Sequence, residues 1–375
     1  MPGSDFLVIG SGIAGASIAF ELAAHARVIV AEQEERHGYH TTGRSAAMYI
    51  ESYGAPAVRR LTVASRGFFD APPAGFADYP LLDPRPCLTI ATDDQSAELD
   101  DVAAQITATG SAWREVTGAE ARGMVPALRA EAANRAILEP DSADIDVNAL
   151  HQGFLRLARA RGVEFRLDAR VVALERVGDG WRASLAGGDT LVAAVLIDAA
   201  GAWADGVAAL AGLGPLGLAP RRRTAILIDP PPGHDIARWP TVLDVAEQFY
   251  FKPQSGLILA SPGDATPSPA VDAAPEEIDI AVCVARVQAA ANIPVHRVAR
   301  AWAGLRTFAP DSIPVIGYDP RTDGFFWFAG QGGYGMQTAP AAARLGAALA
   351  LRRGAPTELA DRGVNAEEFS PARFA

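Results

Sequence analysis

Residues 5–15 read DFLVIGSGIAG, a short apolar run that ends in the pattern G-x-G-x-x-G. The run 5–9 is typical of a buried parallel strand, and the Ala-rich residues 13–24 predict a helix. Residues 27–31 predict a second buried strand. The three elements make one βαβ unit, and the glycine pattern at its first turn is typical of a dinucleotide-binding site.

Each glycine of the pattern has its own physical role. Gly10 allows the tight turn, Gly12 lets the backbone approach a pyrophosphate, and Gly15 lets helix and strand pack closely. The helix N-terminus then faces the phosphate charge. Glu32 ends the second strand 22 residues after Gly10, where an acid binds a free ribose 2′-OH, which favours FAD or NAD over NADP. The same site is expected to include Ile13, Ala14 and Gln33.

The rest of the chain alternates between two kinds of pattern. Residues 147–161 predict an amphipathic helix, 170–185 a hairpin and 191–198 an apolar strand. From 215 to 300, short strands between Pro-rich turns predict an antiparallel sheet. The expected fold class is α/β, a Rossmann-like FAD-binding domain plus an antiparallel β-sheet substrate domain (α+β). The expected domains are 1–49, 138–214 and 300–375 for FAD binding, and 50–137 and 215–299 for substrate binding.

Composition excludes several classes of function. The net charge of -11 argues against a nucleic-acid partner, and two cysteines make neither a disulfide framework nor a zinc site, so no metal is expected. No run of 18 uncharged apolar residues occurs, so no membrane-spanning segment is expected. The first residues lack the pattern of a secretory signal, which favours a cytoplasmic location.

Four stretches resemble the D-amino-acid oxidase-like FAD family, the group with glycine oxidase and sarcosine oxidase. They are HTTGRSAA at 40–47, VLIDAAGAW at 195–203, WAGLR at 302–306 with the residues to 317, and GQGGYG at 330–335. They run in order over almost the whole chain. The resemblance implies noncovalent FAD. It implies that FAD also contacts Thr41, Thr42, Gly43, Arg44, Ser45, Ala46, Ala47, Val171, Ala200, Gly201, Trp203, Gly332, Gly333, Tyr334, Gly335, Gln337 and Thr338.

Within the family, residues 38–40, 53–54, 84–86, 143–146 and 222–223 are most similar to the D-arginine dehydrogenase branch. That resemblance implies hydride transfer from the substrate α-carbon to flavin N5, with the substrate carboxylate held by arginines and tyrosines. The planar fork of arginine suits a carboxylate. The candidate catalytic residues are Tyr53, Arg222, Tyr250, Arg306 and Gly333. Structural ion pairing of Arg306, and a solvated charge cluster around Arg222, are the alternatives.

The candidate side-chain pocket lies at residues 48–53. If this segment is extended, Met48, Ile50 and Ser52 share one face, and Cys87 stands where the resemblance implies an acid that pairs with a guanidinium. None of these side chains pairs with a cation, so the sequence predicts a preference for neutral or apolar D-amino acids over D-arginine. The alternative is a bulge that turns Glu51 into the pocket.

Several alternatives stay open at this level. The chain could instead oxidise a 2-hydroxy acid or a secondary amine of the glycine, sarcosine or proline type, or be a non-catalytic flavin-binding subunit. An NAD-only dehydrogenase would be colourless. His40 stands where some relatives attach FAD covalently, no catalytic base is evident, and the electron acceptor is either oxygen or a quinone.

Overall fold

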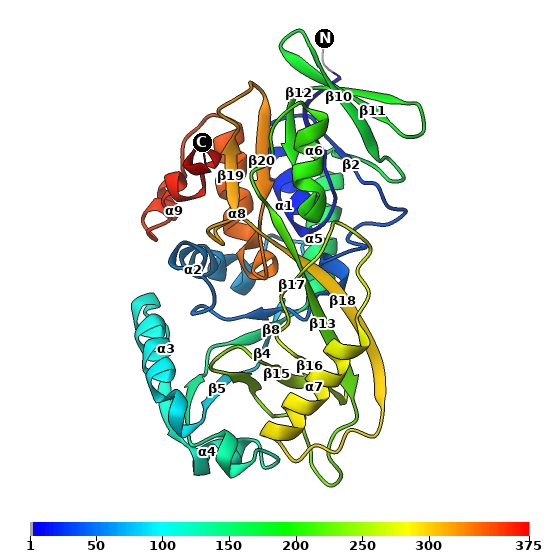
Figure 1. The fold of residues 1–375 in the computed structure, drawn as a ribbon. Helices are drawn as coiled ribbons and strands as arrows, with labels where there is room; N and C mark the ends of the chain where they lie inside the picture. Colours follow the sequence, from blue (N-terminus) through cyan, green and yellow to red (C-terminus); the bar gives the residue numbers. More distant parts are fainter. Residues whose placement is uncertain (1–2, 375) are drawn as a thin grey trace.

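The structure is a computed structural model that describes residues 3–374. It is built on two large β-sheets, which lie toward opposite ends of the molecule in Figure 1. Helix α8 (Gly335–Ala350) lies near the middle of the molecule, and the long strands β13 (Ala219–Ile228) and β18 (Val298–Phe308) of one sheet run from there toward one end. This mixed α/β architecture is the fold class expected from the sequence.

The eight-stranded sheet is parallel at its centre. Its order is β10-β11-β12-β1-β2-β9, with β20 also paired to β12 and β19 to β20. Strands β20, β12, β1, β2 and β9 run parallel, while β10, β11 and β19 are joined to their neighbours antiparallel. The bounds are β1 Ser4–Ile9, β2 Val28–Ala31, β9 Glu164–Arg166, β10 Val171–Val177, β11 Gly180–Leu185, β12 Thr190–Asp198, β19 Val315–Tyr318 and β20 Phe325–Ala329. The predicted N-terminal βαβ unit and the hairpin at 170–185 are confirmed.

Helices cover both faces of this sheet. Helices α1 (Ile13–Leu22), α5 (Val147–Ala160) and α8 pack in one apolar core with the side chains of Val8, Val30 and Ile197. Helix α6 (Ala204–Leu210) packs on the other face. Burial on both faces explains why β1 and β12 read as unbroken apolar runs rather than as alternating patterns.

The nine-stranded sheet has the order β17-β13-β16-β15-β14-β5-β7-β6, and β18 pairs with β13. All its pairs are antiparallel except that of β14 with β5. The sequence predicts an antiparallel sheet, and this sheet is antiparallel in every pair but that one. The remaining bounds are β5 Cys87–Ala91, β6 Arg114–Thr117, β7 Arg135–Glu139, β14 Thr241–Asp244, β15 Tyr250–Gln254, β16 Leu257–Ser261 and β17 Thr266–Pro267.

The two faces of this sheet differ. One face, with Leu88 and Ile226, packs against helix α7 (Glu277–Ala290) through Cys283 and Val287. Helix α4 (Gly118–Met124) joins the same core, and helix α3 (Ser96–Thr109) packs on the opposite face at one end of the sheet. The expectation of a region of short strands over 215–300 therefore misses α7.

A third, three-stranded sheet joins these parts, in the order β3-β8-β4. Its strands are β3 Met48–Tyr49, β8 Ala143–Ile145 and β4 Leu82–Pro84, and helix α2 (Pro56–Asp70) follows β3 after a short turn. The extended conformation expected for 48–53 is wrong beyond Tyr49. The chain turns there: the Tyr53 N–H donates to the Ile50 carbonyl oxygen (3.2 Å), and Gly54 takes a φ of +95°.

The two-domain division stays a proposal. Strands β7 and β18 run across the expected boundaries at 137/138 and 299/300. Over residues 3–374, no helix is long and apolar enough to cross a membrane. Within the same range, no group of three His, Cys, Asp or Glu side chains is placed to hold a metal ion.

Candidate active site

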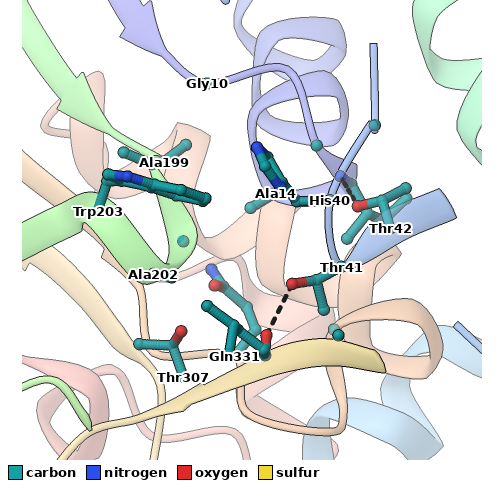
Figure 2. A pocket seen from close by; sticks show the side chains of 18 of the residues that line it. Gly10, Ala14, His40, Thr41, Thr42, Ala199, Ala202, Trp203, Thr307 and Gln331 are labelled. Atoms are coloured by element: carbon teal, nitrogen blue, oxygen red, sulfur yellow. Dashed lines mark hydrogen bonds between the residues drawn. The ribbon is translucent and has the colours of Figure 1, made fainter. Parts of the chain in front are cut away.

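A cavity with a volume of about 340 Å³ opens at the carboxyl ends of β1, β2 and β12. Figure 2 shows the turn at Gly10, the His40–Thr42 segment and Trp203 arranged around it. Ligands of open parallel sheets bind at this edge, where loops from neighbouring strands converge. The cavity lies where the βαβ unit predicts a dinucleotide.

The glycine pattern forms a cradle in which side chains have no room. Gly10 has a φ of +99°, and a Cβ there would lie 2.6 Å from the Ala199 carbonyl oxygen. A Cβ at Gly15 would lie 1.9 Å from the Gly10 carbonyl oxygen, so Gly15 serves close packing of α1 on β1, as expected. Helix α1 begins after Gly12 with no side-chain cap. The Ile13 N–H donates to the Thr42 hydroxyl (2.9 Å), and a helix N-terminus beside a tight glycine turn fits the pyrophosphate of a dinucleotide.

Glu32 lies in the cavity wall at the end of β2, with only 8% of its surface exposed. Its carboxylate accepts bonds from the Ser11 N–H (2.8 Å) and the Ser11 hydroxyl (2.7 Å). Burial and the nearby charge of Arg159 lower the pKa of His37, which contacts Ser11, to about 4. The acid is therefore fixed beside the glycine turn, where a carboxylate that accepts hydrogen bonds fits the ribose hydroxyls of FAD.

His40 also lines this cavity. Its Nε2 lies 2.8 Å from Glu34 Oε1, and its ring centre lies 4.5 Å from that of Trp203 (Figure 2). Its Nδ1 is buried 3.9 Å from an Asp272 carboxylate oxygen. The ring is thus held between an acid and an aromatic side chain.

Most of the residues expected at the cofactor line this cavity. They are Gly10, Gly12, Ile13, Ala14, Glu32, Gln33, Thr41, Thr42, Arg44, Ser45, Ala46, Val171, Ala200, Gly201, Trp203, Gly332, Gly333 and Gly335. Gly15 and Gly43 lie behind the wall, where each allows close backbone packing. Ala47 and Gln337 line the second cavity instead. Tyr334 and Thr338 line neither cavity. The Thr338 hydroxyl donates instead to the Tyr334 carbonyl oxygen at the start of α8.

The second cavity, about 80 Å³, continues from the first. The two share the residues Ser45, Ala46, Arg223, Tyr250, Arg306, Gly333 and Met336. The predicted residues Tyr53, Tyr250, Arg306 and Gly333 are brought together here. A molecule in the second cavity therefore meets whatever occupies the first.

Two arginines face this junction, and among the described residues the one acid within 4.0 Å of either is Asp264. Arg306 Nη1 donates to the Tyr53 hydroxyl (3.3 Å), and Arg223 Nε lies 4.0 Å from the nearest Asp264 oxygen. Burial and the like charge of Arg306 lower the pKa of Arg223. A Cβ at Gly333 would lie 2.9 Å from Arg306 Nη1, so glycine is needed for this close approach. Two buried, mutually repelling guanidinium groups make a site for an anion.

The structure corrects the prediction for Arg222, which lines neither cavity. It pairs with Glu276 and with Asp279, at 3.0 Å, on the face of β13 that packs against α7. Arg223 points to the opposite face because successive side chains of a strand alternate. The predicted residue is thus the strand neighbour of the one that faces the cavity, since a shift of one position reverses the face.

The predicted side-chain pocket forms one wall of the second cavity. Met48, Ile50 and Cys87 all line it. Met48 Sδ accepts a bond from the Thr241 hydroxyl (2.9 Å), and burial and then the charge of Glu139 raise the pKa of Cys87, which keeps it a neutral thiol.

Ser52 and Glu51 do not line this cavity. The Ser52 hydroxyl donates to Glu139 instead (3.0 Å). The Glu51 carboxylate accepts from Tyr49 (2.9 Å) and from Ser111. The alternative in which Glu51 enters the pocket is therefore not what the structure shows.

Sequence reasoning missed several lining residues, among them Arg223, Thr241, Glu247 and Thr307. Thr241 and Leu243 alternate inward on β14, a weak signal in so short a strand. Glu247 lies at the tip of the β14–β15 turn with a φ of +55°. Thr307 is buried on β18, and its hydroxyl has no protein partner among the described residues. No motif marks either of the last two.

Comparison with known proteins agrees with this geometry. Residues 5–349 match the family described as FAD dependent oxidoreductase. Glycine oxidase of Geobacillus kaustophilus (strain HTA426) is 24% identical over 375 residues, covering 95% of each chain. FAD-dependent oxidoreductase domain-containing protein 1 of Mus musculus is 26% identical, covering 93% of this chain and 81% of that protein.

Solved structures share the whole fold. The crystal structure of Geobacillus kaustophilus glycine oxidase has a TM-score of 0.84 at 22% identity, covering 99% of this chain and 98% of the other. That of L-proline dehydrogenase from P. horikoshii has a TM-score of 0.83 at 21% identity, covering 100% and 98%. With the glycine cradle, Glu32 and the paired arginines, the match over 5–349 shows that this chain belongs to the FAD-dependent oxidoreductase family.

Proposed function

We propose that this FAD-dependent oxidoreductase oxidises a D-amino acid at the α-carbon, with a preference for neutral or apolar side chains. The observation that carries the proposal is the pair Arg223 and Arg306, which face the junction of the two cavities; among the described residues the one carboxylate within 4.0 Å of either is Asp264, at 4.0 Å from Arg223. A substrate carboxylate supplies the missing anion. Its α-carbon then lies on the side of the cofactor cavity.

The side chains would act by binding and orienting. The two guanidinium groups offer planar pairs of N–H donors to the carboxylate. The hydroxyl of Tyr53, already bonded to Arg306, and that of Tyr250 complete the donors around it. FAD, when bound, supplies the hydride acceptor. Holding the substrate in one orientation lowers the barrier, because it removes the entropy cost of alignment.

The wall opposite the arginines supports the side-chain preference. Met48, Ile50 and Cys87 offer a thioether, a branched alkyl group and a neutral thiol. A guanidinium buried against these groups would have no partner, which costs several kcal/mol by the usual cost of an unpaired buried charge. Glu247 lies at the exposed rim and is too solvated to replace a buried partner.

A second candidate, a small amine such as glycine, sarcosine or proline, is favoured by cavity size. The second cavity holds about 80 Å³, whereas a protein cavity that binds benzene measures about 150 Å³. Similar proteins include a glycine oxidase, an L-proline dehydrogenase and an iminodiacetate oxidase. These names include substrates without a D-configured side chain, so the stereochemical preference is tested separately from the side chain.

The deciding experiment is anaerobic bleaching of the visible flavin band by single substrates. D- and L-forms of alanine, leucine, methionine and arginine are compared with glycine, sarcosine, proline and D-lactate. Fast bleaching by neutral D-amino acids supports the proposal. Bleaching by glycine and sarcosine alone supports the small-amine candidate, and bleaching by D-lactate alone moves the chain to 2-hydroxy acids. A flavin that no compound bleaches would contradict the enzymatic proposal.

Noncovalent attachment of FAD is part of the same proposal. It is supported by His40, whose Nε2 is already paired with Glu34. Acid precipitation should release the flavin into the supernatant, and flavin retained in the pellet would indicate attachment. A cytoplasmic location stays a prediction, as does the choice of oxygen or a quinone as electron acceptor.

A further inference from the structure

Tyr53 lies in the turn between β3 and α2, and charged side chains hold the residues on both sides of it. On one side, the Ser52 hydroxyl donates to Glu139 Oε1 (3.0 Å). On the other, Arg59 Nε donates to the Gly54 carbonyl oxygen (2.6 Å). The turn has one backbone bond of its own, from the Tyr53 N–H to the Ile50 carbonyl oxygen (3.2 Å). The two side-chain contacts tie this turn to β7 and α2, and so help to place the Tyr53 hydroxyl.

Glu139 is an unexpected residue at its position. It ends β7 and is only 5% exposed, yet it forms no ion pair within 4.0 Å among residues 3–374. It stands directly opposite Cys87 in the pairing of β7 with β5, on the sheet face that forms the substrate cavity. A buried carboxylate is costly, and an apolar side chain would fill this strand end at lower cost.

We propose that Glu139 is a positioning residue. It holds Ser52, and through Ser52 it places the neighbouring Tyr53, which binds the substrate carboxylate. The proposal rests on the proposed function of the arginine site. Tyr53 connects the two parts, because its hydroxyl accepts the bond from Arg306 Nη1. Glu139 itself touches no ligand, since it lines neither cavity.

The groups that face Glu139 make its charge adjustable near neutral pH. Burial raises the pKa of Glu139 to about 7, against the bond from Ser52, which lowers it. Glu51 from the same turn raises it further, and Arg59 from α2 lowers it. The neutral thiol of Cys87 faces it from β5. An ionised carboxylate binds a hydroxyl more strongly than a neutral one, so the turn is held more firmly above this pH.

The test measures binding of propionate to the FAD-loaded protein from about pH 6 to about pH 8.5, where propionate stays ionised. Binding is followed by the change in the visible flavin spectrum. In the natural protein, affinity should rise about fivefold with pH, the difference between a charged and a neutral hydrogen bond. Glu139→Gln keeps an oxygen acceptor but cannot ionise, so its affinity should stay low and flat. The matched control Glu131→Gln changes an exposed acid and should follow the natural protein.

A second variant keeps the test independent of how well Glu139→Gln folds. Ser52→Ala leaves Glu139 in place and removes only the connection, so its pH dependence should also be lost. If Glu139→Gln or Ser52→Ala reproduces the natural pH curve, or if the natural curve is flat, the positioning role is wrong. If propionate does not perturb the flavin at all, the proposed carboxylate site fails instead. The two failures are therefore distinguishable.

Discussion

The sharpest test of the site uses two neighbouring residues on one strand. Arg222 and Arg223 are adjacent on β13, yet they face opposite sides of the sheet. Replacing each with alanine removes the same side chain from two environments. We expect Arg223→Ala to impair catalysis and Arg222→Ala to impair stability.

The loss for Arg223→Ala can be estimated from its surroundings. Removing one partner of a buried charge pair costs about 2–5 kcal/mol. Part of this cost is offset in the free protein, because burial and the like charge of Arg306 already lower the pKa of Arg223. Removing Arg223 therefore also removes a repulsion. A net loss of about 2–3 kcal/mol in transition-state stabilisation, or roughly 30-fold to 150-fold in kcat/KM, is expected.

Arg222→Ala breaks an ion-pair cluster away from the cavities. Its side chain is 11% exposed, its partner Asp279 is 14% exposed and Glu276 is 57% exposed. Since Asp279 would lose its cation in a half-buried position, we expect a loss of about 1–3 kcal/mol in the free energy of unfolding. The value of kcat/KM should change less than about threefold, because no lining residue moves.

The assays are steady-state kinetics with the best substrate from the bleaching screen, and urea unfolding followed by circular dichroism. FAD content measured after acid release serves as the control for both variants. Refutation would come from the reverse pattern, in which Arg222→Ala loses activity at full stability while Arg223→Ala stays active. Equal losses in both variants would also contradict the assignment of faces.

Three further predictions concern single positions. Arg306→Ala should cost about 3–5 kcal/mol in kcat/KM with FAD retained, and Arg306→Lys should rescue little, because an ammonium lacks the planar fork; full activity in either variant would place the anchor elsewhere. Cys87→Glu should raise kcat/KM for D-arginine relative to D-leucine, since it adds an acid to the pocket wall; an unchanged ratio would contradict the pocket assignment.

The free energy of unfolding of Glu139→Gln should depend less on pH than that of the natural protein. Burial raises the pKa of Glu139 to about 7. The protonated carboxyl therefore stabilises the natural protein at low pH, and this stabilisation, on the order of 3 kcal/mol, is lost as pH rises through this value. Urea unfolding at about pH 5 and about pH 8 measures the change.

Local patterns were sufficient for the cofactor half of the site. The strand, glycine turn and helix of residues 4–22 depend on neighbours in the sequence, so a period of apolar residues and a glycine spacing predict them. Glu32 was found in the same way, by its distance along the chain. The resemblance to the family supplied the later segments, most of whose residues line the cavity.

The substrate half depended on information that the sequence carries only weakly. Residues 225–228 are apolar at every position, so no alternation shows which of Arg222 and Arg223 faces the cavity. The bend after Tyr49 depends on Gly54 and on the packing of Tyr334 against it, a contact between positions 280 residues apart in the chain. Helix α7 was missed because it is set by its packing on the sheet as much as by local pattern.

Strand β18 fixes the substrate part of the site relative to the cofactor part. Consecutive residues of β18 contact three separate parts of the site. The Leu305 carbonyl accepts from the Thr41 hydroxyl (2.7 Å), the Arg306 side chain enters the substrate cavity, and the Thr307 carbonyl accepts from the Gly332 N–H (2.8 Å). Because β18 contributes backbone carbonyls to both outer contacts, substitution of its own side chains leaves these acceptors in place. The carboxylate anchor is therefore fixed relative to both cofactor segments by strand geometry, while Tyr53, on a turn tied to its neighbours by side chains, is the adjustable part of the site.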